Sequence, residues 1–232
     1  MKTPNTQLMK QAREALKGRW LLVICTFFVY MLLMSLASIP EHHIPAGIQP
    51  LFAYLPFVWL VFLYGPFWLG VTTFSLAVAR NQEPKLCMLF AGFKQNYLKS
   101  IGVFLLMFLF MFLGLLLFII PGFIVIAMLA LVFFILHDNP QIGVWQALKQ
   151  SKKMMVGFKA KYIGLMLMFL GLMILAYTPL VLALVAGLPF VGFLAFVAIP
   201  AVIIGTLCLI PFMQITLAKF YEDVKAHNTD MA

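Results

Sequence analysis

The sequence has little charge, and two long intervals have none. Only 10% of its residues are charged and 64% are hydrophobic, with a mean hydropathy of +1.06. Residues 100–137 and 162–218 contain no Asp, Glu, Lys or Arg. A soluble domain is about half apolar and about a quarter charged. The composition therefore argues against a soluble domain and predicts a protein whose solvent is lipid.

The apolar runs also lack the alternation of polar and apolar residues that spanning β-strands show. Residues 103–120, VFLLMFLFMFLGLLLFII, are an example. Because a spanning segment must satisfy its backbone hydrogen bonds internally, the pattern predicts an all-α integral membrane bundle. We expect residues 1–232 to form a single membrane domain.

The cysteines are few and far apart, at Cys25, Cys87 and Cys208, with no CxxC pair. This spacing argues against a disulfide framework or a cysteine metal site. Glu41, His42 and His43 lie together in the segment 39–50, but adjacent histidines do not share a helical face and no third ligand group is nearby. A solvated loop is the better interpretation, and we expect no metal site and no cofactor.

The predicted spans contain no ionisable side chain other than His137, at the edge of one of them. Intramembrane catalysis needs a nucleophile and a base, and coupled transport commonly needs an embedded acid. We therefore expect no catalytic residue and no enzymatic activity. Spans broken by proline and glycine leave open the passage of a lipid-like or small apolar substrate.

Hydropathy and the positions of proline and glycine predict six spans, at about residues 20–38, 57–79, 101–120, 123–137, 162–185 and 191–216. A retained first span is favoured over a cleaved signal peptide because its apolar run is too long. A single helix over 101–136 would reach ~54 Å, against ~30 Å of hydrocarbon. We therefore predict a hairpin turn at Pro121-Gly122, the alternatives being one kinked helix or a pair that dips in and returns. The predicted helix breaks are Gly65, Pro66, Pro121, Gly122 and Pro189.

Positive charge is confined to four segments. The 16 Lys and Arg residues fall within 2–19, 80–99, 149–161 and 219–225. Six crossings put all four segments on one side, as the positive-inside rule requires of the cytoplasmic face. Both termini are thus predicted to be cytoplasmic. The net charge of +9 is better explained by this inner face than by nucleic acid, for which there is no motif.

A basic amphipathic helix is expected before each of three hairpins of spans. These helices would begin at Thr3-Pro4, Glu83-Pro84 and Asn139-Pro140, with each proline in the first turn. The similarity of these three helices is explained either by an internal repeat or by features that any basic interfacial helix before a membrane span shares. The tail 219–232 is expected to be short and frayed. The residues predicted to lie at lipid headgroups are Arg13, Lys17, Arg19, Lys94, Lys99, Trp145, Lys149, Lys152, Lys153, Lys159 and Lys161.

Four polar residues within the last two spans are expected to hydrogen-bond between helices, as such residues do in membranes. They are Tyr177, Thr178, Thr206 and Gln214.

Several blocks of the sequence resemble a known family. They are YGPFWLG (64–70), LFAGFKQNY (89–97), FIIPGF (118–123), HDNPQIGVWQALKQSKKMMVGFKAKY (137–162) and KFYED (219–223). Together they resemble bacterial membrane proteins classed as domain of unknown function 975, over nearly the whole chain. The family is similar to the membrane domain fused to some glycerophosphodiesterases. The resemblance implies a bacterial multi-pass protein and no particular activity. A Trp expected in the fifth-span region is lacking here.

The sequence thus predicts a six-span protein of the cytoplasmic (inner) membrane. We expect a non-enzymatic role in envelope or membrane homeostasis, or as an accessory to transport or immunity. The alternative is a permease for a lipid-like or small apolar substrate. The expected partners are anionic inner-leaflet lipids. A homo-oligomer or a membrane protein partner stays open, and no nucleic acid is expected.

Overall fold

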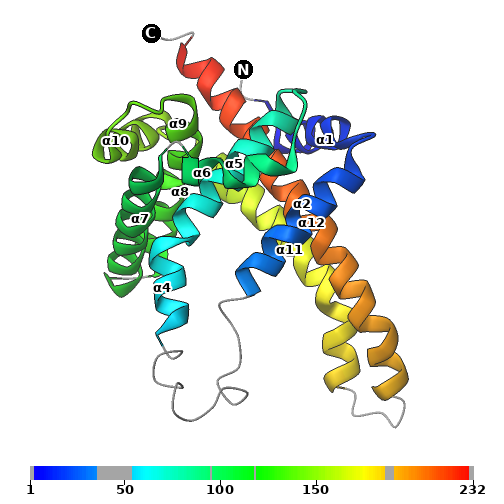
Figure 1. Ribbon diagram of the computed structural model, residues 1–232. Helices are drawn as coiled ribbons and strands as arrows, with labels where there is room; N and C mark the ends of the chain where they lie inside the picture. The colour runs from blue at the N-terminus through cyan, green and yellow to red at the C-terminus, as the bar shows by residue number, and fades with distance from the viewer. Residues whose placement is uncertain (1–2, 36–53, 95, 118, 186–190, 230–232) are drawn as a thin grey trace.

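The computed structural model describes residues 3–35, 54–94, 96–117, 119–185 and 191–229. Every regular element in these ranges is helical, as predicted. In Figure 1 the helices converge at one end of the molecule and spread apart toward the other. The predicted loop at 39–50 and Pro189 lie outside the described residues.

The chain begins with two helices that meet almost at a right angle. Helix α1 (Asn5–Leu16) and helix α2 (Trp20–Ser35) are bent by 98° at the break between them. Along α1 the side chains of Leu8, Ala12 and Leu16 are buried, and they pack against the rest of the protein. Thr3 was expected to cap α1. The cap position belongs to Pro4, and the Thr3 hydroxyl instead donates to Asp223.

The second apolar segment is broken where its proline predicts. Helices α4 (Leu55–Phe62) and α5 (Tyr64–Ala79) meet at a bend of 50°. Pro66 lies in the first turn of α5 and has no N–H to donate to the carbonyl four residues earlier, so a continuous helix would be strained there. The bend falls at Leu63, just before Gly65-Pro66.

The segment after α5 packs backbone against backbone. It forms a 3₁₀ helix η3 (Leu86–Phe90) and one turn, α6 (Ala91–Lys94), where one amphipathic helix from Glu83-Pro84 was predicted. A Cβ added to Gly70 would lie 1.8 Å from the Leu89 carbonyl oxygen, and one added to Gly92 would lie 2.2 Å from that of Pro66. Only glycine allows such an approach, and the tight wrap explains why the segment departs from one regular helix.

The central apolar segment contains helices α7 (Tyr97–Leu117), α8 (Ile119–Leu129) and α9 (Val132–Asp138). Helices α7 and α8 lie side by side, and a Cβ on Gly114 would be 3.0 Å from the Gly122 Cα. The predicted break at Pro121-Gly122 is misplaced by a few residues. Pro121 and Gly122 lie in the first turn of α8. A backbone N–H there has no partner within the helix, so the N–H that proline lacks costs no hydrogen bond. The turn at residues 130–131, between α8 and α9, was not predicted.

Helix α10 (Val144–Met154) carries most of the third basic cluster. Asn139 and Pro140 were expected to start it, but α10 begins four residues later, with Gly143 as its N-cap. The Gln146 side chain accepts from the Gly143 N–H at 3.4 Å. Asp138 does not cap α10, and its carboxylate forms ion pairs with Arg80 and Lys225.

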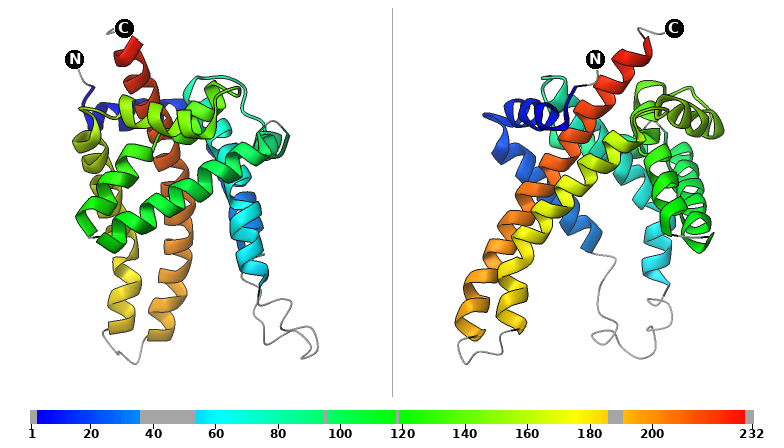
Figure 2. Two further views of the ribbon diagram at one scale, coloured as in Figure 1. Left: turned by 90° about the vertical axis from the view of Figure 1, so that its left-hand side faces the viewer. Right: turned by 180° about the vertical axis from the view of Figure 1, so that it is seen from behind.

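The last two helices form the longest pair. They are α11 (Lys159–Val185) and α12 (Val191–Thr229), which Figure 2 shows running together away from the rest of the molecule. The expectation of a frayed tail is wrong up to Thr229. Phe220, Tyr221 and Val224 are buried, so the helix of the sixth predicted span continues through the tail as a packed element.

By length and composition, three helices among the described residues could each cross a membrane: Tyr97–Leu116, Lys159–Thr178 and Val202–Asn228. The number rises to five if the bent pairs α1–α2 and α4–α5 each count as one crossing. Residues 122–138 form a shorter apolar helical segment. This is compatible with a membrane protein.

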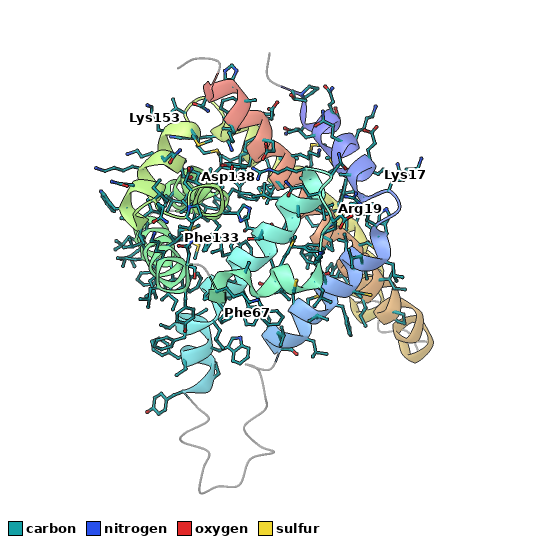
Figure 3. The ribbon with its side chains drawn as sticks, turned by 45° about the horizontal axis from the view of Figure 1, so that its top comes forward. Lys17, Arg19, Phe67, Phe133, Asp138 and Lys153 are labelled. Atoms are coloured by element: carbon teal, nitrogen blue, oxygen red, sulfur yellow. The ribbon has the colours of Figure 1, made fainter. Side chains whose placement is uncertain are left out.

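Both termini lie at the same end of the molecule (Figures 1 and 2). That end also holds α1, α10 and the turn between α5 and η3. In Figure 3 Lys17 and Arg19 lie on one flank of this end and Lys153 on the opposite flank, with Asp138 between them. We call it the basic end. The basic segments of the sequence therefore gather in space.

The backbone contact at Gly70 gives a direct test of the packing. Gly70→Ala places a methyl group against the Leu89 carbonyl and should cost about 3 kcal/mol. We expect the thermal unfolding midpoint in detergent to fall by about 10 °C. Gly171→Ala on α11 is the matched control, since its Cβ meets no atom within 4 Å. That change should be neutral or add up to about 1 kcal/mol of stability. Equal midpoints for the two variants would contradict the packing described.

Candidate functional site

A cluster of charged side chains joins three helices at the basic end. Arg80, at the C-cap of α5, donates from Nη2 to both Asp138 carboxylate oxygens at 2.9 Å. Its Nε and Nη2 also donate to Glu222 Oε1 at 2.9 and 2.7 Å. Lys225 and the Tyr221 hydroxyl donate to Asp138 Oδ2. We call Arg80, Asp138, Tyr221, Glu222 and Lys225 the ion cluster.

Asp138 needs these partners because of its position. It is the last residue of α9, where the partial negative charge of the helix end opposes a carboxylate. Its side chain is only 9% exposed. Two cations and a hydroxyl from α5 and α12 compensate for both effects, so the ends of α5 and α9 are tied to the last turns of α12.

Electrostatics within the cluster favour its charged form. Burial alone would raise the pKa of the Asp138 carboxyl, but hydrogen bonds from Lys225, Arg80 and Tyr221 outweigh burial and hold that pKa below its usual value. Burial raises the pKa of the Tyr221 hydroxyl, and the adjacent Asp138 carboxylate raises it further. Asp138 is therefore ionised at neutral pH, with three donors already on its oxygens. It has the bonding of a structural carboxylate rather than that of a free base.

A second ion pair fixes the start of the chain. Lys161 on α11 donates to Asp223 on α12 at 2.6 Å, and Thr3 donates to the same carboxyl group. The Asn5 side-chain amide donates to the Lys161 carbonyl at 3.1 Å. Through these contacts the beginning of α1 is held against α11 and α12.

An apolar groove with two lysines lies between α7, α8 and α10. Its volume is about 310 Å³. Phe110, Met128 and Leu148 are among its apolar walls, and Lys149 and Lys152 also line it. The Lys149 ammonium lies 5.8 Å from the centre of the Trp145 ring, within the range of a cation–π interaction. We call this feature the lysine groove.

The structure brings some of the predicted headgroup residues together and separates others. Trp145, Lys149 and Lys152 share the lysine groove, whereas Lys161 is engaged with Asp223. Arg19 donates to the Gln82 carbonyl at 3.1 Å, and Lys99 donates to the Pro140 carbonyl at 2.6 Å. Six of these cations are exposed: Arg13 on α1, Lys17 at its C-cap, Lys94 on α6, and Lys149, Lys152 and Lys153 on α10. Lys159 is partly buried at the start of α11.

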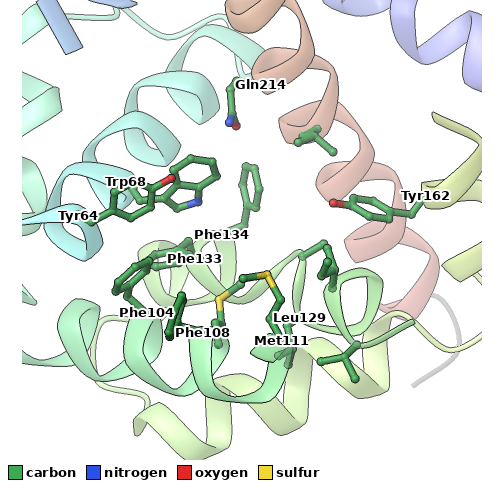
Figure 4. A pocket seen from close by; sticks show the side chains of 15 residues that line it. Tyr64, Trp68, Phe104, Phe108, Met111, Leu129, Phe133, Phe134, Tyr162 and Gln214 are labelled. Carbon is green, nitrogen blue, oxygen red and sulfur yellow. The ribbon is translucent and has the colours of Figure 1, made fainter. Parts of the chain in front are cut away.

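The hydrogen bonds expected between the last two spans are partly present. The Tyr177 and Thr206 hydroxyls lie 3.2 Å apart and join α11 to α12. Thr178 instead donates to the Ile174 carbonyl of its own helix. Gln214 is buried, but it faces a cavity rather than a neighbouring polar group (Figure 4).

The acidic half of the ion cluster was missed from the sequence. Asp138 lies just before the Asn139-Pro140 pair that was expected to start a helix, and Tyr221, Glu222 and Lys225 lie in the tail that was expected to be frayed. One signal was available: Phe220, Tyr221 and Val224 continue the apolar spacing of a helix past the last span. The contacts of Tyr221 with Asp138 and of Glu222 with Arg80 depend on tertiary packing and have no signal in the local sequence.

Comparison with known proteins finds one family. The model of a family described as protein of unknown function (DUF975) matches residues 1–133 and again residues 114–228. No curated protein and no solved structure matches the chain significantly.

The ion cluster makes stability depend on Asp138 and on pH. Asp138→Asn leaves Arg80 and Lys225 without their shared anion, and we expect a loss of about 2 kcal/mol. The thermal midpoint in detergent at pH 7 should fall by about 6 °C. Glu83→Gln, which removes an exposed acid from the same end, is the control and should change the midpoint little. If both variants lose the same stability, general charge rather than the cluster is responsible.

The sign of the pH dependence follows from the lowered pKa of Asp138. A depressed carboxyl pKa stabilises the fold above the unfolded-state value, about 3.9, and this stability is lost as pH falls through the lower folded-state value. The wild-type midpoint should therefore fall more steeply below about pH 4 than that of Asp138→Asn. Midpoints recorded from pH 7 down to pH 3 test this, and parallel curves for the two proteins would contradict it.

Proposed function

The chain belongs to the DUF975 family of proteins of unknown function, and we propose that it is a multi-pass, non-enzymatic protein of the bacterial cytoplasmic membrane that binds anionic lipid at its inner face. Such binding fits a role in membrane or envelope homeostasis, or as an accessory to a transport or immunity system. The observation that carries the proposal is the lysine groove.

Six crossings are part of the proposal, formed by α2, α4–α5, α7, α8–α9, α11 and α12. Large apolar side chains stand exposed on these helices, among them Leu116, Leu170 and Leu175, at 73%, 54% and 68% exposure. Contact with lipid removes that surface from water. Residues 122–138 would span about 26 Å, slightly less than the hydrocarbon core, so the bilayer would be locally thinned there.

The orientation follows from charge. Both termini and the basic segments share one end (Figure 1), and the positive-inside rule assigns that end to the cytoplasm. With α2 as a crossing, the 98° bend lays α1 along the membrane surface. Lys10, Arg13 and Lys17 are exposed on α1 and would face anionic headgroups.

The lysine groove offers both parts of a phospholipid a partner. An acyl chain would lie against the apolar wall that includes Phe110, Met128 and Leu148, and a phosphate would meet Lys149 and Lys152. Trp145, 53% exposed, suits the headgroup level that tryptophan prefers. Each lysine near an anionic surface contributes about 1 kcal/mol. Two lysines on one groove favour an anionic lipid over a zwitterionic one.

Two observations support the proposal that the protein is not an enzyme: the residue types in the predicted spans, and the hydrogen bonds of the ion cluster. The predicted spans carry no embedded acid or base apart from His137. Its Nδ1 lies 3.0 Å from the Thr73 hydroxyl, and His137 borders the ion cluster, in which the Asp138 oxygens are already hydrogen-bonded.

A second candidate function is passage of a lipid-like or small apolar substrate. The observation in its favour is a cavity of about 320 Å³ among α5, α7, α8, α9, α11 and α12. A permease would need this cavity to open in turn toward each side of the membrane.

Lipid binding is tested by native mass spectrometry of the purified protein with phosphatidylglycerol and phosphatidylcholine. Lys149→Ala with Lys152→Ala removes both groove cations, about 2 kcal/mol of attraction in all, and should weaken phosphatidylglycerol binding about 30-fold. Phosphatidylcholine binding should change little. Lys153→Ala is the matched control, because Lys153 is exposed on the same helix and does not line the groove. Equal losses in the double variant and the control would point to diffuse attraction and contradict a groove site.

The orientation is tested by cysteine labelling in intact cells, in a background where Cys25, Cys87 and Cys208 are replaced by alanine. A membrane-impermeant maleimide should label Gln49→Cys, in the predicted outer segment, without permeabilisation. It should label Lys153→Cys, on α10, only after the membrane is opened. Labelling of Lys153→Cys in intact cells would overturn the proposed topology.

A further inference from the structure

A partly open cavity between α5, α7, α8, α9, α11 and α12 is lined almost entirely by apolar side chains (Figure 4). Aromatic rings from α5, α7 and α9 form much of its wall, including Trp68, Phe104 and Phe133, and Met107 and Met111 add polarisable sulfur. Its volume of about 320 Å³ is roughly twice the ~150 Å³ of an apolar cavity known to hold one benzene ring. The cavity therefore has room for a compact molecule of about two rings.

Two buried polar groups point into this cavity. Gln214 on α12 is 5% exposed and Tyr162 on α11 is 8% exposed. Figure 4 shows the Gln214 amide and the Tyr162 hydroxyl directed into the space bounded by the aromatic rings. Neither side chain has a hydrogen-bond partner among the described residues. A buried amide with two donors and an acceptor usually finds hydrogen-bond partners, so these two groups are available to hydrogen-bond a polar group of a bound molecule.

The lining also defines the charge of that ligand. No Lys, Arg, His, Asp or Glu is among the residues that line the cavity. A charged group would lose its hydration there without gaining a counter-ion, which is strongly unfavourable. The ligand must therefore be neutral. The aromatic walls, with Tyr64 and Trp68 stacked at 5.8 Å between ring centres, suit a flat ring system better than a flexible chain.

We propose that this cavity binds a neutral, flat, two-ring molecule with one carbonyl or hydroxyl group, which Gln214 and Tyr162 hydrogen-bond. The site is distinct from the lysine groove, although Val125 and Leu129 of α8 contribute to the walls of both. It goes beyond anionic lipid binding and does not depend on it. The rival occupant is the tail of a bilayer lipid.

Trp68 makes the cavity directly observable. A variant that keeps Trp68 as its sole tryptophan (Trp20→Phe, Trp59→Phe, Trp145→Phe) is reconstituted in nanodiscs and titrated with 6-bromo-2-naphthol, whose bromine quenches indole fluorescence at contact. We expect saturable quenching of Trp68. A second variant that keeps only Trp20, outside the cavity, is the matched control and should show only the linear quenching that accompanies partition into lipid.

The hydrogen-bonding residues are tested in the same background. Gln214→Leu keeps the bulk of the side chain and removes its polar atoms, so the apparent Kd should rise about tenfold. Tyr162→Phe removes a single hydroxyl and should raise it by about threefold to tenfold. This second variant keeps the test valid if Gln214→Leu does not fold. Lys152→Ala, in the lysine groove, should leave the Kd unchanged, which separates this site from the lipid site.

Three results would overturn the proposal. The first is linear quenching of Trp68 equal to that of Trp20. The second is saturable quenching that neither Gln214→Leu nor Tyr162→Phe weakens. The third concerns the rival occupant and uses nanodiscs made with lipids brominated on the acyl chain. In this result the brominated lipid quenches the fluorescence of Trp68 as strongly as that of Trp20, and added 2-naphthol does not relieve the quenching of Trp68. In that case a lipid tail fills the cavity.

Discussion

The carboxylate of Asp138 is the point on which the basic end of this protein depends. It stands at the unfavourable end of α9 and is held there by Arg80 from α5 and by Lys225 and Tyr221 from α12. Glu222 in turn bonds Arg80. Charges this poorly solvated must be paired, so the cluster sets where three helices end relative to one another. It thereby supports the α9–α10 connection and the helix that bears the lysine groove.

Close backbone contact provides the second constraint. Gly70 and Gly92 let η3 and α6 wrap against α5 at a distance that no side chain would permit, and Gly114 and Gly122 do the same for α7 and α8. In lipid the hydrophobic effect does not drive helices together, so small residues that allow close packing carry much of the association. The blocks YGPFWLG and LFAGFKQNY, which resemble the family, contain these glycines of α5 and α6. Their physical role here is to make one interface.

Helix α8 has a place in both candidate binding features. Val125 and Leu129 line both features, Met128 lines only the lysine groove, and Ile126 lines only the cavity with Gln214 and Tyr162. The groove combines cations with an apolar wall and suits an anionic amphiphile. The cavity is uncharged and suits a neutral one. Both features fit the proposed binding of membrane molecules, and Ala130, in the helix break at residues 130–131, lines the cavity.

Much of this protein was predictable because burial in lipid imposes simple rules. The uncharged runs were predicted to be helical, and Pro66 was predicted to bend one of them. The four segments that contain the lysines and arginines were predicted to lie on one side, and they share one end of the molecule. Along α1, Leu8, Ala12 and Leu16 recur every four residues and are buried on one face. These features depend on neighbours within one or two helical turns, or on the exclusion of charge from hydrocarbon. The types of residue in a short stretch of sequence are enough to predict either.

Other features were decided only when distant segments met. The tail after residue 218 was expected to fray, yet its Tyr221 and Lys225 donate to a carboxylate more than eighty residues earlier in the chain, and its Glu222 accepts from Arg80. Helix α10 starts four residues later than expected, and Asp138 pairs with cations from other segments. Gln214 was expected to join two spans but faces a cavity. By itself the sequence determined which segments are helical and which end carries the charge. Tertiary structure decided the partners, because an ion pair or a cavity depends on distances between helices that no local pattern encodes.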